Sequence, residues 1–230
     1  MGYKYQMHTH TSPCSKCAVM TPEELAVGLF DGGYSGCVMT NHFYGGNTGI
    51  DREIPWESFV DAYEKDWREC ARAAKKYGLD IFFGVEDHVG GGREILCYGF
   101  PPEILRAHPE LSQRSLDNWI KVKSECDGLI IQAHPFRVRA YITNPGAFPL
   151  DKIDGIEVYN AGNLPEANAE AEDFAVKNPG IILTSGADTH DQSSVCCGGL
   201  EFDARIDSDE KLIQSLRKGT YKIIRGEEND

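Results

Sequence analysis

Short apolar runs alternate with longer amphipathic stretches along the chain, which is the pattern of strands and helices in alternation. The apolar runs predict strands over residues 3–7, 36–40, 80–85, 95–98, 128–133, 155–159, 180–185 and 221–224. The amphipathic stretches predict helices over residues 21–31, 56–77, 112–125, 165–177 and 209–218. Because no linker-like break divides these elements, we expect a single barrel-like α/β domain over residues 1–225, followed by an acidic tail over residues 226–230.

Local signals mark where several of these elements begin and end. Thr21 and Pro22, followed by two glutamates, have the order of an N-cap, a first helical proline and an acidic first turn. Glycine at position 32 and at position 78 follows a predicted helix, where a C-terminal stop is expected. The run Gly90-Gly91-Gly92 predicts a turn between two strands.

Composition changes this picture mainly by excluding partners. Hydrophobic residues make up 41% and charged residues 26% of the 230-residue chain, as in ordinary globular proteins. The formal charge of −13 and the lack of a Lys or Arg run repel a nucleic-acid backbone, so we do not expect a nucleic-acid partner. The chain shows neither the apolar stretch of a signal peptide nor a membrane span, so we expect a soluble cytoplasmic protein.

The eight cysteines are expected to be mostly reduced thiols, as in other cytosolic proteins. Cys37, Cys97 and Cys126 lie in or beside apolar segments and are expected to fill the core. Cys14-x-x-Cys17 could be a redox pair or half of a zinc site, and its single C-x-x-C does not decide between them.

Polar residues of the types that bind metals follow the predicted strands. Six of the seven histidines lie at these points, and two carboxylates accompany them: His8, His10, His42, His88, His134 and His190, with Glu86 and Asp188. The carboxyl ends of parallel strands lie on one face of an α/β protein, so these residues should converge in space. His8 and His10 point the same way from an extended strand, so both imidazoles can reach one ion.

Some of these residues also have a less specific interpretation. His108 lies away from the pattern in a proline-flanked loop and is expected to be inert, and His88 could face solvent. Glu157 could be an ordinary carboxylate of its strand. The recurrence of the motifs after strand upon strand nevertheless predicts metal binding, because imidazoles and carboxylates suit zinc, iron or manganese.

Taken in order, these motifs resemble those of the PHP (polymerase and histidinol phosphatase) family. The resemblance is carried by His8-x-His10, Thr40-Asn41-His42, Gly84-Val85-Glu86, His134-Pro135 and Asp188-Thr189-His190, which together extend over most of the chain. It implies a distorted (β/α)7 barrel of the TIM-like kind, with two or three divalent ions (Zn, Mn or Fe) that hydrolyse phosphate esters.

The resemblance also implies how the ligands are divided among the ions. One ion would be held by four residues: His8, His10, Glu86 and Asp188. A second would share Glu86 and add His134 and Glu94, while a third would use His42 and His190.

Two departures from the family pattern bear on these ions. Relatives often complete the third ion with a His or Asp soon after the first motif, where this chain has Lys16 and Cys17. Either Cys17 or Cys14 substitutes there, or the third ion is weak or absent. At the second ion many relatives have histidine or aspartate where Glu94 stands, and Glu94 could instead be a surface carboxylate.

The expected reaction is hydrolysis of a small-molecule phosphate monoester by metal-activated water. Arg137, Arg93 and Lys16 are candidate phosphate-binding residues, and Asp188, His190 and Arg137 are the candidate catalytic residues. A barrel amidohydrolase or deaminase is the alternative enzyme, and a non-catalytic metal-binding module is the alternative of another class. The substrate, the metal and the oligomeric state are left open.

Overall fold

The signals that begin and end helices act where the sequence predicts. In the computed structural model, which describes residues 2–226, Thr21 accepts a hydrogen bond from the Glu24 N–H, and the Glu24 side chain accepts one from Thr21 in return. This capping box begins the first helix, with Pro22 as its first residue. Gly78 closes the second helical stretch in the left-handed conformation, with φ of 70°.

The described residues form nine strands, six α-helices and three short 3-10 helices. Their bounds are β1 (Tyr3–Thr9), α1 (Pro22–Asp31), β2 (Gly36–Met39), α2 (Trp56–Ala74), η1 (Lys75–Tyr77), β3 (Asp80–His88), β4 (Glu94–Tyr98), α3 (Pro102–Ala107), η2 (Pro109–Ser112), α4 (Leu116–Lys123), β5 (Leu129–Gln132), β6 (Gly155–Asn160), α5 (Pro165–Lys177), β7 (Ile182–Gly186), η3 (Gln192–Ser194), β8 (Gly198–Phe202), α6 (Asp209–Lys218) and β9 (Tyr221–Arg225).

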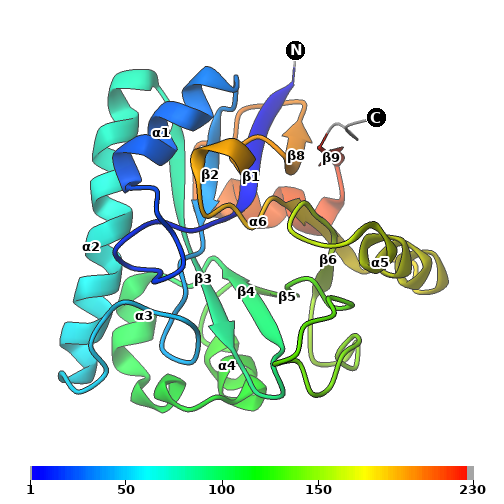
Figure 1. Ribbon diagram of the computed structural model, residues 1–230, viewed down its shortest axis with the longest axis horizontal. Coiled ribbons are helices and arrows are strands. Elements are labelled where there is room, and N and C mark those ends of the chain that lie inside the picture. Colours follow the sequence, from blue (N-terminus) through cyan, green and yellow to red (C-terminus); the bar gives the residue numbers. More distant parts are fainter. Residues whose placement is uncertain (1, 227–230) are drawn as a thin grey trace.

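All nine strands belong to one sheet, in the order β7-β6-β5-β4-β3-β2-β1-β8-β9 (Figure 1). The sheet curls until the segment after β7 returns to β1, where the His10 N–H donates to the Thr189 carbonyl over 3.0 Å. Strands β1 to β7 therefore form a nearly closed barrel, and β8 and β9 extend the sheet beyond β1. The predicted α/β barrel in a single domain is confirmed.

One part of the barrel differs from the parallel pattern that the sequence suggested. Strands β3 and β4 form an antiparallel hairpin across Gly90–Gly92, and β4 is also antiparallel to β5. All three glycines of this turn have positive φ, which explains their concentration there. Because β4 runs in the opposite direction, its first residue, Glu94, lies at the rim where the parallel strands end.

Several boundaries also differ from the prediction. Strand β3 continues to His88, so Glu86 lies within the strand and not after it. The helix expected over residues 112–125 begins only at Leu116, because Ser115 is its N-cap and accepts from the Asn118 N–H. Strand β8 and helix α3 were not predicted, because β8 opens on two glycines and α3 has only six residues.

Helices cover the outside of the sheet, and α1 and α2 lie side by side along β1–β3 (Figure 1). Buried side chains of several strands pack within the barrel, among them Tyr5, Val38, Leu96 and Ile131. Cys37 and Cys97 are fully buried, as expected, and Cys126 is partly buried. None of the described helices has both the length and the apolar character needed to cross a membrane. Of the expected acidic tail, residues 227–230 lie outside the described residues.

The close pairing of β2 with β3 leaves no room for a side chain at Gly36. A Cβ added to Gly36 would lie 1.8 Å from the Asp80 carbonyl oxygen, a backbone atom that cannot give way without moving β3. We expect Gly36→Ala to lower the free energy of unfolding by about 3 kcal/mol or more in urea denaturation.

Gly33→Ala is the matched control, because its Cβ would meet nothing within 4 Å while its φ of +69° still penalises a side chain. It should cost only about 1 kcal/mol. Equal losses in the two variants would contradict the tight β2–β3 contact.

Candidate metal centre

The barrel brings residues from distant parts of the chain to one rim. Strand β1 contributes His8 and, just beyond its end, His10; β3 contributes Glu86; and the segments after β5 and β7 contribute His134 and Asp188. His8, His10 and Glu86 are at most 1% exposed. The convergence predicted from the sequence therefore occurs, in a buried environment.

The first cluster joins four side chains at ligand distances. The His8 Nε2 atom lies 3.1 Å from His10 Nε2 and 3.1 Å from Glu86 Oε1, and 3.5 Å from Asp188 Oδ1. The His10 Nε2 atom lies 3.3 Å from Glu86 Oε2 and 3.2 Å from Asp188 Oδ1. Ligands about 2.0–2.1 Å from a tetrahedral ion are about 3.3 Å from one another. These four side chains are thus spaced as the ligands of a single ion, and they are the set implied for the first ion.

The proton positions strengthen this assignment. The His8 Nδ1 atom is 3.0 Å from Glu157 Oε1, so its N–H donates to a carboxylate. The His10 Nδ1 atom is 3.1 Å from Ser15 Oγ, whose own proton goes to Asn41 Oδ1. Both Nδ1 atoms therefore hold the proton, and both Nε2 atoms present lone pairs to each other and to two carboxylates. A metal ion bound among these atoms would satisfy their lone pairs and balance the buried carboxylate charge.

A second cluster surrounds the other side of Glu86. The His134 Nε2 atom lies 3.2 Å from Glu86 Oε1 and 3.5 Å from Glu94 Oε2. His42 is also close, because its Nδ1 atom lies 2.8 Å from Glu86 Oε2. Neither atom of that last pair has a hydrogen bond of acceptable geometry among the described residues, although both are buried. A buried ring nitrogen and a buried carboxylate oxygen without hydrogen bonds fit a site at which metal ions bind.

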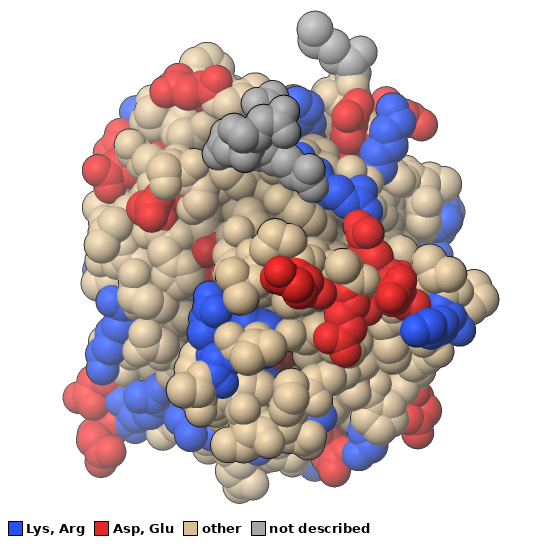
Figure 2. Space-filling model, turned by 45° about the vertical axis from the view of Figure 1, so that its right-hand side comes forward, with Lys and Arg blue, Asp and Glu red and all other residues tan. Residues whose placement is uncertain are grey.

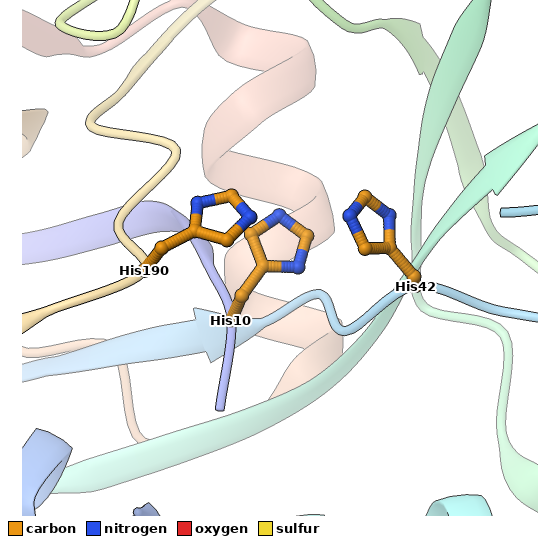
Figure 3. Close-up of side chains that lie close together, drawn as sticks. All are labelled: His10, His42 and His190. Atoms are coloured by element: carbon orange, nitrogen blue, oxygen red, sulfur yellow. The ribbon is translucent and has the colours of Figure 1, made fainter. Parts of the chain in front are cut away.

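A third group consists of imidazoles, those of His10, His42 and His190 (Figure 3). The ring of His10 lies between the other two, with its centroid 4.4 Å from that of His42 and 4.4 Å from that of His190. The His190 Nε2 atom is also 3.0 Å from the Cys17 sulfur. Cys14, the other cysteine of the C-x-x-C pair, is buried in the core cluster that contains Phe43.

Electrostatics distinguishes the carboxylates of the centre. Burial raises the pKa of Glu94 to about 8, with the nearby Glu86 charge acting in the same direction. Burial also opposes ionisation of Asp188, but His8, His10 and Arg137 outweigh it and hold the pKa well below its usual value. Burial raises the pKa of Cys17, whereas hydrogen bonds with His190 and His42 bring it down to about 6. A buried rim with this charge pattern is typical of functional sites.

Two of the candidate ligands have strained backbones. His134 has φ of 30° and Asp188 has φ of 52°, and these are the non-glycine residues with positive φ among those described. Such conformations cost roughly 1–3 kcal/mol and persist where the surrounding structure holds them. Here both serve to turn a side chain toward Glu86 and its neighbours.

The three basic candidates have different surroundings. Arg137 is nine-tenths buried at the cavity wall, where its Nη1 lies 2.7 Å from Asp188 Oδ2 and its other nitrogens donate to Asn160 and Asn163. Arg93 lies over the Phe148 ring, 3.9 Å from its centroid, and it is not among the described cavity-lining residues. Lys16 is exposed and also does not line the cavity.

A cavity of about 780 Å³ opens above the centre. Its wall includes Arg114, Tyr141 and Thr143, which no sequence motif indicates because they lie in loops. The Arg114 Nε–H donates to the Gly45 carbonyl over 3.0 Å, which holds the guanidinium at the wall. The rim of the barrel thus combines metal-ligand types with an arginine-bearing pocket.

The remaining sequence candidates have structural contacts. His88 lines the cavity and accepts a hydrogen bond from the Gly92 N–H. His108 is largely buried and lies between Glu110 and Glu125, away from the metal centre and not in an open polar loop. Glu157 has a larger role than the sequence suggested, because its Oε1 orients His8 and its Oε2 accepts from the His134 N–H and from Asn160.

No protein-family model and no curated protein matches the sequence, but solved structures do match the fold. A two-domain protein from Bacteroides vulgatus, which contains a predicted PHP-like metal-dependent phosphoesterase, has a TM-score of 0.70 at 14% identity. The match covers 98% of this chain and 65% of that one.

Two further structures match over nearly their whole length. PsfC from Pseudomonas syringae has a TM-score of 0.70 at 15% identity, with 99% of this chain and 93% of that one covered. An amidohydrolase from Chromobacterium violaceum, with bound sulfate and no metal, has a TM-score of 0.59 at 16% identity, with 96% and 97% covered. The chain therefore has the PHP-like barrel fold, which metal-dependent phosphoesterases and an amidohydrolase share.

The contacts of Glu157 predict that the affinity for the first ion depends on this residue, although it is not a ligand. Both carboxylate oxygens of Glu157 accept hydrogen bonds, one from His8 and the other from the His134 N–H and Asn160. In Glu157→Gln, one of these oxygens becomes an NH2 group that faces another donor, which should disturb the orientation of His8. We expect this variant to bind Zn²⁺ about 10–100-fold more weakly in a competition titration with a chromophoric chelator.

Glu170→Gln, on the exposed face of α5, is the matched control and should leave the affinity unchanged. Wild-type affinity in Glu157→Gln would mean that the His8–Glu157 contact does not support metal binding.

Proposed function

We propose that this protein is a metal-dependent hydrolase that cleaves a small-molecule phosphate monoester with two or three divalent ions. The observation that carries the proposal is Glu86, whose two oxygens face the ligand atoms of adjoining clusters at the floor of an arginine-bearing cavity. A carboxylate between neighbouring ions is the arrangement of two-metal hydrolytic sites. The ions would be zinc, manganese or iron, which this set of nitrogen and oxygen ligands accepts.

The residues divide the work of the reaction. The bound ions would supply Lewis-acid stabilisation of the phosphoryl oxygens and lower the pKa of water. His8, His10, Glu86 and Asp188 would hold the first ion, and Glu86, Glu94 and His134 would hold the second. Arg114, whose guanidinium is fixed at the cavity wall, is the side chain best placed to bind a phosphate group.

Arg137 and His190 have supporting roles in this proposal. The Arg137 guanidinium holds Asp188 through a 2.7 Å ion pair, so it fixes the orientation of this ligand while facing the cavity. His190 lies at the cavity wall, with 29% of its side chain exposed, and its Nδ1 donates to the Asp188 carbonyl over 2.7 Å, which leaves Nε2 available as a ligand atom.

A small substrate fits the cavity and the charge of the chain better than a nucleic acid. The face in Figure 2 carries acidic and basic side chains side by side, with a group of acidic ones at its centre. With a formal charge of −13, the chain would repel a long phosphate backbone, whereas one phosphate group can be neutralised inside the cavity by arginine and metal.

An amidohydrolase is the second candidate, because one structure of this fold bears that name. That structure contains a bound sulfate and no metal. The phosphoester proposal also accounts for the arginines at the cavity, for which a neutral amide offers no partner.

The first test compares metal content and substrate class in one sample. We expect purified protein to contain at least two divalent ions per chain by elemental analysis and to hydrolyse members of a phosphomonoester panel but not a dihydropyrimidine. Asp188→Ala removes a ligand of the first ion, so it should reduce bound metal and lower turnover by several orders of magnitude.

Asp203→Ala, at an exposed position after β8, is the control and should retain metal and turnover. Full activity in Asp188→Ala would contradict the assignment of the first ion. Turnover of the dihydropyrimidine without any phosphatase activity would favour the amidohydrolase.

The position of Arg114 predicts a separate effect on substrate binding. Arg114→Ala removes a charged hydrogen-bond donor worth about 1.5–3 kcal/mol, so KM for phosphomonoesters should rise roughly 10–100-fold. Metal content should stay at the wild-type level, because Arg114 is not among the ligand groups. Arg114→Lys keeps the charge but not the planar guanidinium, so its KM should lie between those of the wild type and Arg114→Ala. An unchanged KM in both variants would mean that Arg114 does not bind the phosphate group.

A further inference from the structure

The third group of candidate ligands, His10, His42 and His190, does not by itself supply enough ligand atoms for an ion. The Nε2 atom of His10 belongs to the first cluster, and its Nδ1 atom donates to Ser15 Oγ, so both of its ring nitrogens are committed. His42 and His190 are then the imidazoles left for another ion. Two neutral nitrogens are fewer protein ligands than the three that a catalytic zinc site normally has.

Cys17 lies where a further ligand is needed. Its sulfur is 3.0 Å from His190 Nε2 and also adjoins His42, and it lines the cavity (the two imidazoles are drawn in Figure 3). The sulfur and nitrogen ligands of one tetrahedral zinc ion are about 3.5 Å apart, so the observed contact is within reach of a shared ion. The side chain of His42 is nine-tenths buried, and its Nδ1, 2.8 Å from Glu86 Oε2, has no hydrogen bond of acceptable geometry among the described residues, so this imidazole is available to a metal ion.

The backbone holds Cys17 in this position. The Lys16 N–H donates to the Asn47 carbonyl over 3.0 Å, and the Val19 N–H donates to the His190 carbonyl over 3.0 Å. The segment that carries Cys17 is therefore attached on either side of the cysteine, once to the loop after His42 and once to His190 itself. A sulfur placed by such contacts needs little rearrangement to bind a metal.

We propose that Cys17 is a thiolate ligand which, with His42 and His190, holds a third divalent ion at the rim of the metal centre. The inference rests on the metal centre of the proposed function. Binding forms a sulfur–metal bond and releases the thiol proton to solvent, so the thiolate adds one negative charge to a pair of neutral imidazoles. A soft sulfur ligand favours zinc or cobalt over manganese at this position, whereas the other two clusters offer only nitrogen and oxygen.

The neighbouring residues of the motif do not compete for this role. Cys14 is only 3% exposed and packs in the core cluster, and Lys16 is exposed and does not line the cavity. Of the C-x-x-C pair, Cys14 therefore lies in the core and Cys17 lies at the cavity.

Cobalt substitution provides a direct test, because a thiolate ligand gives Co²⁺ a near-ultraviolet charge-transfer band that nitrogen and oxygen ligands do not. We expect metal-free full-length protein titrated with Co²⁺ to develop this band. Cys17→Ser should lose the band and bind one Co²⁺ fewer per chain by elemental analysis. Cys17→His should restore the ion count without the band.

Cys14→Ala is the matched control and should keep both the band and the count, and circular dichroism establishes that each variant is folded. A band that survives in Cys17→Ser, or wild-type protein that binds cobalt without a band, would overturn the proposal. The phosphatase panel on the same samples separates the two proposals: a band without phosphatase activity supports the Cys17 site and contradicts only the reaction proposed above.

Discussion

The arrangement of the barrel rim depends on the cost of burying Glu86, Asp188 and two imidazole lone pairs at one point. Charged groups removed from water are expensive unless each has a partner, and like groups at about 3 Å make the cost larger. The Nδ1 atoms of His8 and His10 are held by hydrogen bonds to Glu157 and Ser15, so each ring directs its Nε2 atom toward the carboxylates. The residues that contact the ligands, Glu157 and Ser15, therefore orient the two imidazoles toward the same point. Carboxylate–histidine pairs have this role in metal sites.

Closure of the barrel is what makes this convergence possible. The hydrogen bonds between the segment after β7 and β1 run through Thr189 and flank His8 and His10, so the strand pairing and the ligand spacing are set by the same contacts. Asp188 and His190 adjoin Thr189 and therefore face the two histidines of β1. The left-handed backbone of Asp188 is a local cost of this closure, offset by the Arg137 ion pair and the surrounding pairing.

The sequence predicted the parts of this structure that depend on short-range pattern. Apolar runs, helix caps and the i, i+2 spacing of His8 and His10 are local features, and the elements and the first ligand set follow from them. Partners that approach across the barrel have no such signal. Arg114 reaches the cavity only through tertiary packing, and the sequence around it has no distinguishing pattern. Strand β8 was missed for a related reason, since its pairing with β1 and β9 compensates for two glycines that weaken an isolated strand.

Glu94 shows how topology, and not residue type, determines a ligand. A glutamate two residues after a glycine turn could equally be a surface carboxylate. In a purely parallel barrel, the start of a strand would lie at the opposite rim from the histidines. The three glycines allow β3 to turn back directly into β4, and this reversal brings the first residue of β4 within 3.5 Å of His134. The antiparallel hairpin is therefore part of the metal centre, because without it the second cluster would lose one of its carboxylates.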